Sequence, residues 1–369
     1  MEFGKIRKYI VFLIFGLFAF LVLQGVPSEA QKDAKISKED KELLDRARTF
    51  FAPLPKVADN PDNKITPDKV KLGKMLYFDP RLSKSGFISC NSCHNLSTYG
   101  VDNLPTSIGH KWQLGPRNAP TTLNAALHIA QFWDGRAKDV EEQAKGPILN
   151  PKEKASPSEK FVVDRFKSIP EYVELFKKAF PEEKDPLTYD TITKAIAAFE
   201  RTLLTPSRFD KFLQGDTRAL SQEEKEGLKL FIEVGCTACH RGVGIGGDMY
   251  QKFGIVKPYY EVIKYSDPSM IDKGRYEVTK NEADMYVFKV PSLRNVTRTY
   301  PYFHDGSVWR LEDAVSIMAE IQLGRKLEPA QVSKIVAFLR SLEGQIPQDA
   351  LTLPVLPPST EATSKPDTK

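Results

Sequence analysis

Two short stretches of the chain combine paired thiols with an imidazole. Cys90 to His94 places two cysteines three residues apart with a histidine directly after the second, and Cys236 to His240 repeats the arrangement. In a C-x-x-C-H motif each thiol adds to one vinyl group of a porphyrin, and the adjoining histidine becomes the proximal ligand of the iron. The sequence therefore predicts two covalently bound haem c groups. Their attachment residues are Cys90, Cys93, Cys236 and Cys239, and their proximal ligands are His94 and His240.

Two other kinds of site also use a C-x-x-C pair. One is a structural zinc site and the other is a dithiol redox pair. The repetition of the motif, with a histidine in both copies, favours haem attachment over these alternatives. Because the two motifs use all four cysteines, no thiol remains for a disulfide.

The first 30 residues have the pattern of a secretion signal. A basic start precedes an apolar run of 15 residues from Tyr9 to Leu23, and Ser28 to Ala30 offers a small-residue cleavage site. The run is short for a membrane span, so a cleaved signal is favoured over a retained anchor, which stays open as an alternative. We expect a periplasmic protein, because c-type haem is attached outside the bacterial cytoplasm.

The composition of the chain indicates its fold class. The 339 residues after the signal are enough for two domains of ordinary size. With 26 prolines, 22 glycines and few alternating β-branched runs, we expect an all-α fold whose helices are joined by long irregular loops. The formal net charge is +5, from 53 basic and 48 acidic residues, and nothing in it suggests a nucleic-acid partner.

Local signals predict several helices and a domain junction. Pro67 begins a helix that ends near Asp79, and Ser221 with Glu224 forms a capping box for another. Thr205 to Ser207 is the best candidate for the junction. The expected domains are an N-terminal haem domain at 31–205, a C-terminal haem domain at 206–350 and an extended tail rich in Pro, Ser and Thr at 351–369. Further helices are expected within 31–55, 170–180 and 191–204.

A second internal parallel indicates a duplication. Pro120 to Asn124 is followed, eight residues after Asn124, by Phe132 to Gly135. In the second half, Pro291 to Asn295 is followed at the same interval by Phe303 to Gly306. Equal spacing predicts two diverged copies of one haem domain. Their chemistry should differ where a tryptophan in the first copy stands against a histidine in the second.

A series of motifs runs in a fixed order along the mature chain. They are Leu72 to Ser83, Cys90 to His94, Pro105 to His110, Gly115 to Asn118, Gln131 to Arg136, Glu142 to Pro147 and Pro301 to His304. In these motifs the sequence closely resembles the bacterial di-haem cytochrome c peroxidases. The resemblance implies an all-α fold of two cytochrome c-like domains and a homodimer. It also implies reduction of hydrogen peroxide to two waters, with electrons from a small soluble donor such as a cytochrome c or a blue-copper protein.

The resemblance also implies the distal ligands of the two irons. It makes Met318 the distal ligand of the C-terminal, electron-accepting haem, although its apolar helical face would by itself favour core packing. A His/Met pair raises the potential of the iron, which suits a haem that collects electrons. It makes His110, in a glycine-flanked loop, the removable distal ligand of the N-terminal, peroxidatic haem. Weaker candidates for a distal ligand are Met249, Met270 and Met285.

Further roles rest on the resemblance alone. Trp133, which could be a plain core aromatic, is implied to carry electrons between the haems. Glu153 and Gln143 are implied to line the peroxide pocket as catalytic residues, where a carboxylate can take and return the proton that O–O cleavage moves. His128 is interpreted as a packing residue and His304 as a structural residue near the second haem. The implied ligands of one calcium ion are Asn118, Thr299 and Pro301.

Two other functions stay open. A di-haem electron-transfer cytochrome without its own substrate would keep both irons six-coordinate, whereas Gln143, Glu153 and a releasable His110 favour a peroxidase. A related type of enzyme, which oxidises a protein tryptophan, carries a tyrosine at the position of Met318. That departure ranks the second alternative lower.

Overall fold

The computed structural model describes residues 36–263, 265 and 271–369. The predicted signal segment and Met270 therefore lie outside the described residues. Within the described ranges, no helix combines the length and the apolar character that crossing a membrane requires. The part from Lys38 to Lys369 forms one unit, and the elements below all belong to it.

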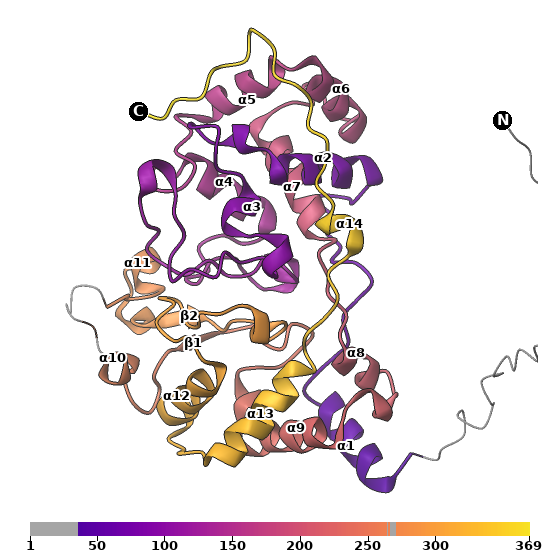
Figure 1. Cartoon of the computed structure of the whole chain (residues 1–369), viewed down its shortest axis with the longest axis vertical. Helices are drawn as coiled ribbons and strands as arrows, with labels where there is room; N and C mark the ends of the chain where they lie inside the picture. The colour runs from indigo at the N-terminus through magenta and orange to yellow at the C-terminus, as the bar shows by residue number, and fades with distance from the viewer. Residues whose placement is uncertain (1–35, 264, 266–270) are drawn as a thin grey trace, which may run out of the picture. The chain divides into compact units, whose positions relative to one another are not determined.

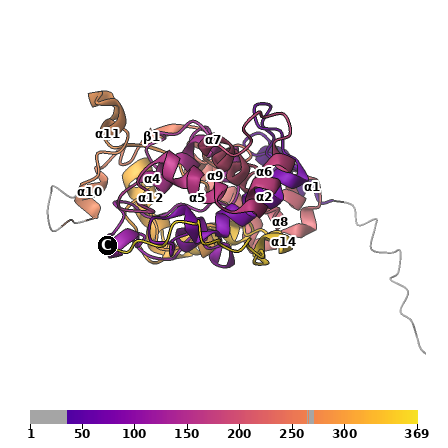
Figure 2. The same cartoon turned by 90° about the horizontal axis from the view of Figure 1, so that it is seen from above.

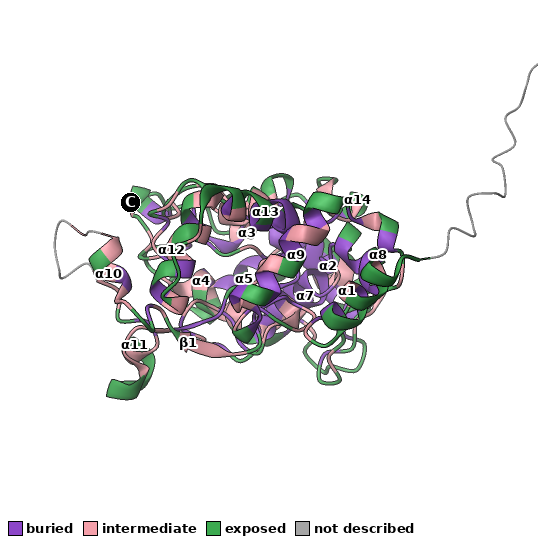
Figure 3. Ribbon diagram, turned by 90° about the horizontal axis from the view of Figure 1, so that it is seen from below, coloured by how far each residue is buried: buried purple, intermediate pink, exposed green. Residues whose placement is uncertain are grey.

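The first helical group lies in the upper half of Figure 1. Its helices are α2 (Pro67–Phe78), α3 (Cys90–Cys93), α4 (Val140–Leu149), α5 (Glu159–Lys167), α6 (Pro170–Ala179) and α7 (Tyr189–Glu200). As predicted, α2 begins with Pro67 in its first turn, after Thr66 has capped the backbone N–H of Lys69. Apolar side chains of α2, α5, α6 and α7 share one core. Figure 3 shows that α7 is buried along most of its length.

The second helical group lies in the lower half of Figure 1, apart from α11, which lies at mid-height above the strands. Its helices are α1 (Lys38–Arg48), α8 (Arg208–Leu213), α9 (Gln222–Val234), α10 (Tyr259–Val262), α11 (Tyr276–Thr279), α12 (Leu311–Leu323) and α13 (Pro329–Arg340). The predicted capping box of Ser221 and Glu224 starts α9, and Gly235 ends it with a φ of 103° just before the second thiol motif. Helix α1 packs into the second core through Leu44 and Ala47, although it precedes the first motif in sequence.

One close helix pair stabilises each group. Helix α2 packs on α7 at Gly73, where a Cβ would lie 1.8 Å from the backbone oxygen of Ala195. Helix α9 packs on α13 at Gly227, where a Cβ would lie 1.9 Å from the backbone oxygen of Lys334. Only a residue without a side chain permits either approach. The two groups therefore rest on the same kind of glycine-dependent helix pair.

The predicted duplication has a counterpart in the backbone. Asn124 and Asn295, at the ends of the two matching motifs, both adopt the left-handed conformation, with φ of 61° and 60°. Both side-chain amides donate hydrogen bonds to the hydroxyl of Thr205, at 2.8 Å and 2.9 Å. Thr205 belongs to the predicted junction, so equivalent residues of the two copies meet there. The exact domain boundaries stay a prediction.

The fold is mostly helical rather than strictly all-α. Strands β1 (Tyr250–Lys252) and β2 (Val287–Lys289) form an antiparallel pair, with Tyr250 opposite Lys289. They lie between the two helical groups in Figure 1. Three residues are too few to show an alternating pattern in the sequence, which is why the pair was not predicted.

The C-terminal tail runs back across the first helical group. It begins after the short helix α14 (Gln348–Leu351) and passes α2, α6 and α5 (Figures 1 and 2). Arg165 on α5 donates to the hydroxyl of Ser364 at 2.7 Å, and Thr360 donates to the backbone oxygen of Ser168 at 2.9 Å. Near its end, Asp367 forms a 3.1 Å ion pair with Lys84. The tail is therefore fixed to the protein surface.

Candidate functional site

The first thiol motif occupies a single helical turn. The hydroxyl of Ser92 accepts a hydrogen bond from the backbone N–H of Ser89 at 3.0 Å, which caps the turn. Because residues three apart share a helix face, the side chains of Cys90 and Cys93 lie on the same side of this helical turn. Burial raises the pKa of both thiols, that of Cys93 to about 11. A reactive dithiol pair needs a lowered thiol pKa, so this environment weighs against that alternative.

His94 follows the turn directly. Its backbone oxygen accepts a 2.6 Å hydrogen bond from the hydroxyl of Tyr77 on α2. Burial lowers the pKa of the His94 imidazole, which favours the neutral form that binds metals. Its Nδ1 atom is buried and has no hydrogen-bond partner among the described residues.

His110 and Glu153 lie on two loops that are joined through their backbones. The N–H of His110 donates to the backbone oxygen of Glu153 at 2.8 Å. The preceding Gly109 comes so close that a Cβ there would lie 1.9 Å from the backbone oxygen of Lys152. The His110 ring is buried, its Nδ1 has no partner within the described ranges, and burial lowers its pKa. The structure therefore brings the predicted distal ligand next to the predicted acid–base residue.

The predicted catalytic pair belongs to α4 and the turn after it. Gln143 lies half-buried on α4, and Glu153 lies in the turn that follows the helix. The carboxylate of Glu153 accepts a 2.7 Å hydrogen bond from the amide of Asn150. Burial raises the pKa of Glu153, against the opposing charges of Lys154 and Arg136. A carboxyl group in this setting exchanges its proton closer to neutral pH than an exposed glutamate does.

Two further ionisable side chains near the first motif escaped the sequence analysis. Lys154 is buried and its Nζ lies 2.9 Å from the Sγ of Cys90. Glu200 on α7 is buried, and burial raises its pKa to about 8. Lys154 stands in a lysine-rich loop and Glu200 beside Arg201, so both resemble solvated charges in the sequence. Only the fold distinguishes them.

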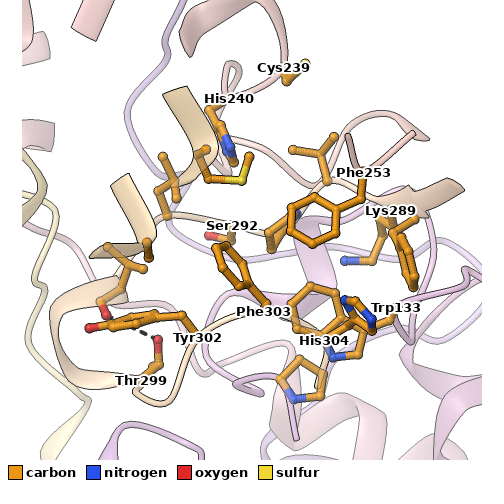
Figure 4. A pocket seen from close by; sticks show the side chains of 18 of the residues that line it. Trp133, Cys239, His240, Phe253, Lys289, Ser292, Thr299, Tyr302, Phe303 and His304 are labelled. Atoms are coloured by element: carbon orange, nitrogen blue, oxygen red, sulfur yellow. Dashed lines mark hydrogen bonds between the residues drawn. The ribbon is translucent and has the colours of Figure 1, made fainter. Parts of the chain in front are cut away.

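The second thiol motif opens into an apolar cavity of about 250 Å³ (Figure 4). Cys236, Cys239 and His240 line it, together with apolar side chains of α9, α12 and α13. His240 is buried, and burial lowers its pKa to about 4, so the imidazole is neutral at pH 7. A Cβ at Gly246, which has a φ of 110°, would lie 3.2 Å from the Nδ1 of His240. The glycine makes room for the ring.

Met318 lines the same cavity as His240. It lies on α12 on the face that also carries Leu311, Ala314 and Val315, and all four side chains border the cavity. The apolar face that favoured core packing therefore faces a cavity large enough to take a ligand. Met249 and Met285 are not among the residues that border it. The role of Met318 as an iron ligand stays a prediction.

Trp133 and His304 occupy equivalent positions in the two copies and face each other. Their rings meet edge to face, with centroids 6.3 Å apart. The indole N–H of Trp133 donates to the backbone oxygen of Asn118 at 2.9 Å, and the N–H of Asn118 donates to the backbone oxygen of His304 at 2.7 Å. Figure 4 shows both rings across the pocket from His240. Trp133 therefore lies where the two helical groups meet.

The predicted calcium ligands also border this cavity. The side-chain amide nitrogen of Asn118 donates a hydrogen bond to the backbone oxygen of Leu104 at 2.9 Å, so the amide oxygen is not used in this contact. Within the described ranges, this oxygen and the backbone oxygens of Thr299 and Pro301 accept no hydrogen bond. Amide and carbonyl oxygens are suitable ligands for a hard cation. The structure thus brings the three residues into one region, and the ion itself stays a prediction.

The side chains present fit the binding of haem c at both motifs. At the second motif, two thiols, a neutral imidazole and a thioether border an apolar cavity, and porphyrins are bound by such a set. At the first, two thiols stand with the partly buried imidazole of His94 and the buried imidazole of His110, and burial lowers the pKa of both rings. In the part of the chain that the structure describes, no three His, Cys, Asp or Glu side chains group as a zinc site requires.

Comparisons with known proteins match both halves of the chain. Residues 67–218 match the di-haem cytochrome c peroxidase family, and residues 224–343 match the cytochrome c family. A cytochrome c551 peroxidase of Nitrosomonas europaea is 56% identical over 312 residues, covering 83% of this chain and 89% of that protein. A cytochrome c551 peroxidase of Pseudomonas aeruginosa is 50% identical over 351 residues, covering 94% of this chain and 96% of that protein.

The fold also matches the solved structure of a MauG-like protein. A MauG-like protein associated with microbial copper homeostasis superposes with a TM-score of 0.71 at 27% identity, covering 87% of this chain and 99% of that chain. The two relatives named above are peroxidases, which favours a peroxidase over an electron carrier without a substrate. The chain therefore belongs to the di-haem cytochrome c peroxidase family, with two haem c groups and peroxidase activity.

Proposed function

We propose that the chain reduces hydrogen peroxide to two waters at its first haem site, using electrons accepted at its second. The donor is a small soluble redox protein, either a cytochrome c or a blue-copper protein. When bound, the haems supply irons that hold single electrons and, at the first site, a coordination position for peroxide. The observation that carries this division of labour is the contrast between the ionisable groups around Cys90 and the apolar cavity around His240.

Glu153 moves the proton that O–O cleavage requires. Its backbone oxygen is hydrogen-bonded to the His110 loop, and its carboxylate is positioned by Asn150 and has a pKa raised by burial. A carboxylate can take the proton from one peroxide oxygen and return it to the leaving oxygen, as general acid–base catalysis demands. The amide of Gln143 orients the peroxide through hydrogen bonds.

His110 controls access to the first site. His110 would supply a ligand to the first haem in the oxidised protein, and its loop would withdraw when the second site is reduced, which would make room for peroxide. The support for such a gate is the loop itself, which is bordered by Gly109 and carries the exposed Trp112 and Leu114. Segments of low local stability are suited to opening, and reduction can shift the equilibrium only by its differential energy. Trp133, between the two helical groups, provides the path for electrons to the first site.

A stopped-flow measurement tests this function directly. The fully loaded protein is mixed with hydrogen peroxide and a reduced cytochrome c, and oxidation of the cytochrome is followed. We expect two cytochromes to be oxidised for each peroxide consumed, because reduction to water takes two electrons. A loaded protein that oxidises no donor in the presence of peroxide, with either a cytochrome c or a blue-copper protein, would contradict the proposal.

We also propose one calcium ion at Asn118, Thr299 and Pro301, between the two haem domains. The three unused oxygens support it, because a hard cation prefers oxygen ligands. Thorough chelation should remove the metal and lower both turnover and electron transfer between the haems. If metal content, haem communication and turnover were all unchanged by chelation, the site would not exist.

Two assignments concern the assembly and location of the protein. We propose a homodimer, which sedimentation of the loaded protein tests. We further propose export to the periplasm with cleavage at the small-residue site, on the strength of the signal pattern. N-terminal sequencing of the mature protein from cell fractions checks the cleavage site and the compartment together.

A further inference from the structure

Lys289 is a buried cation inside the second cavity. It ends strand β2 and is only 7% exposed, and it borders the same cavity as His240 and Met318. Figure 4 shows its side chain reaching from the wall into the pocket. The lining is otherwise predominantly apolar. A lysine in such a position needs an explanation, since lysines are rarely buried without a partner.

The partners that the protein gives this lysine do not neutralise its charge. Its backbone N–H donates to the backbone oxygen of Trp133 at 2.8 Å. Its Nζ lies 3.3 Å from the Nδ1 of His128, an uncharged acceptor. Among the described residues, no carboxylate lies within ion-pair distance of it, and burial lowers its pKa to about 8. An ammonium group has three donors, and one neutral acceptor leaves the others unsatisfied.

His128, from the predicted N-terminal haem domain, orients Lys289, which belongs to the predicted C-terminal haem domain. Its ring packs so tightly on Gly247 that a Cβ there would lie 2.3 Å from the ring carbon Cδ2. The next residue, Ile129, donates its N–H to the backbone oxygen of Gly247 at 2.9 Å. Burial, together with the charge of Lys289, lowers the pKa of His128 well below its usual value, so the ring is neutral. A fixed, neutral imidazole can accept a hydrogen bond from Nζ and so direct the remaining two donors.

A bound group can supply the anion that the described residues do not give to Lys289. Burying an unpaired charge is costly, and the cost falls when an anion with good hydrogen-bond geometry is supplied. A haem carries two propionate carboxylates, and a haem attached at Cys236 and Cys239 would share this cavity with Lys289. A carboxylate there would complete the hydrogen bonds of the ammonium group.

We propose that Lys289, oriented by His128, binds a haem propionate where the two haem domains meet and raises the midpoint potential of that haem. A positive charge in a low-dielectric site stabilises the iron state that holds one more electron. The inference rests on the proposed placement of the second haem in this cavity. It adds a determinant of potential that is independent of the axial ligands.

The test compares variants of the haem-loaded protein by spectroelectrochemical titration. Lys289→Met removes the charge and keeps the length of the side chain, and Lys289→Arg restores a cation. Lys252→Met is the matched control, because Lys252 lies exposed on the neighbouring strand β1. We expect Lys289→Met to lower the potential of the second haem, Lys289→Arg to recover most of the loss, and Lys252→Met to leave both potentials unchanged.

Each outcome separates the propionate site from the proposed function. Haem content and peroxide turnover report on the two haem sites, whereas only the potentials report on Lys289. A fall confined to the first haem would contradict the inference, because Lys289 borders the cavity of Cys236, Cys239 and His240. Unchanged potentials in a Lys289→Met protein with both haems would overturn the inference. If Lys289→Met loses haem, the potentials of Lys289→Gln are measured instead, because glutamine keeps a hydrogen-bond donor without the charge. Unchanged potentials in that variant would likewise overturn the inference.

Discussion

The two haem sites share a motif and a supporting helix pair but differ in the side chains that surround them. The first has ionisable groups close to its thiols: the partly buried Glu153 and the buried Lys154 on one turn, and the buried Glu200 on α7. The second has a cavity lined mainly by apolar side chains, in which Lys289 is a buried cation. The same motif and the same kind of helix pair therefore stand in two unequal electrostatic environments.

The difference matches the chemistry proposed for each site. Cleaving an O–O bond requires a group that exchanges a proton at working pH, and burial of carboxyl groups raises their pKa toward that range. Holding an electron requires a site whose surroundings reorganise little, which an apolar cavity provides. Under the proposed function, the two haem domains differ in role because of the side chains around each haem and not because of the motif.

The largest expected effect is the loss of proton transfer at the first site. Glu153→Gln keeps the shape of the side chain and its hydrogen bond to Asn150 but removes the exchangeable proton. Turnover should fall by roughly 10²–10⁴ while both haem spectra are retained. Steady-state peroxide reduction measures the loss. The matched control is Glu142→Gln, on the exposed face of α4, and near-normal turnover in Glu153→Gln would remove Glu153 from the mechanism.

The second prediction concerns removal of the His110 side chain, which should leave a free coordination position at the first haem but not at the second. In His110→Gly the first haem should be five-coordinate or water-bound, and the enzyme should be active without prior reduction. Absorption spectra and turnover of the fully oxidised protein measure the two effects. Lys111→Gly loosens the same loop at a residue with a φ of 56° but keeps the imidazole. A His110→Gly protein that still required reduction would refute the gate.

The third prediction makes the second site more like the first. Met318→His replaces a thioether by an imidazole, which stabilises the oxidised iron and should lower the upper of two redox waves. Axial ligands set haem potentials over roughly 0.8 V, so the change should be readily measured. Ser316→His, on the exposed face of α12, is the control. A single wave in the unmodified protein with both haems present would contradict the assignment of unequal haems.

The smallest expected effect concerns a feature that the two halves share. Each contains a buried ion pair, Arg201 with Glu141 at 2.7 Å and Arg294 with Asp210 at 2.9 Å. Burial alone would raise the pKa of both carboxyl groups, but their arginine partners outweigh it and hold each pKa below its usual value. Both pairs should therefore stabilise the fold above about pH 4, the pKa range of unfolded carboxyl groups.

This stability is lost as the pH falls through the lowered pKa values. Each unit of depression corresponds to about 1.4 kcal/mol of unfolding free energy. Chemical denaturation of the loaded protein between neutral and acid pH measures it, with Arg201→Met and Arg294→Met as the informative variants. Each variant should be less stable at pH 7 and less sensitive to acid. If only one of the two variants became less sensitive to acid, the buried ion pairs of the two halves would differ in their contribution to stability.

The sequence alone predicted the number of haems, their attachment residues and several helix starts. These features depend on neighbours along the chain: a C-x-x-C-H motif is complete within five residues, and Thr66, Ser221 and Glu224 cap helices that begin beside them. The equal spacing of the two halves also predicted a duplication whose asparagines meet at Thr205. The roles of Met318, His110, Glu153 and the other predicted site residues rest on the resemblance and await the measurements above.

Only the tertiary structure showed how charges are buried and which segments cross between the halves. Lys289 meets His128 from a position 161 residues away, and Lys154 reaches Cys90 across 64 residues. Helix α1 packs into the second core, and the tail is fixed along the first helical group. A lysine in a loop or a short strand has the same local pattern whether it is solvated or buried. Its environment is decided by the segments that pack around it, and those come from elsewhere in the chain.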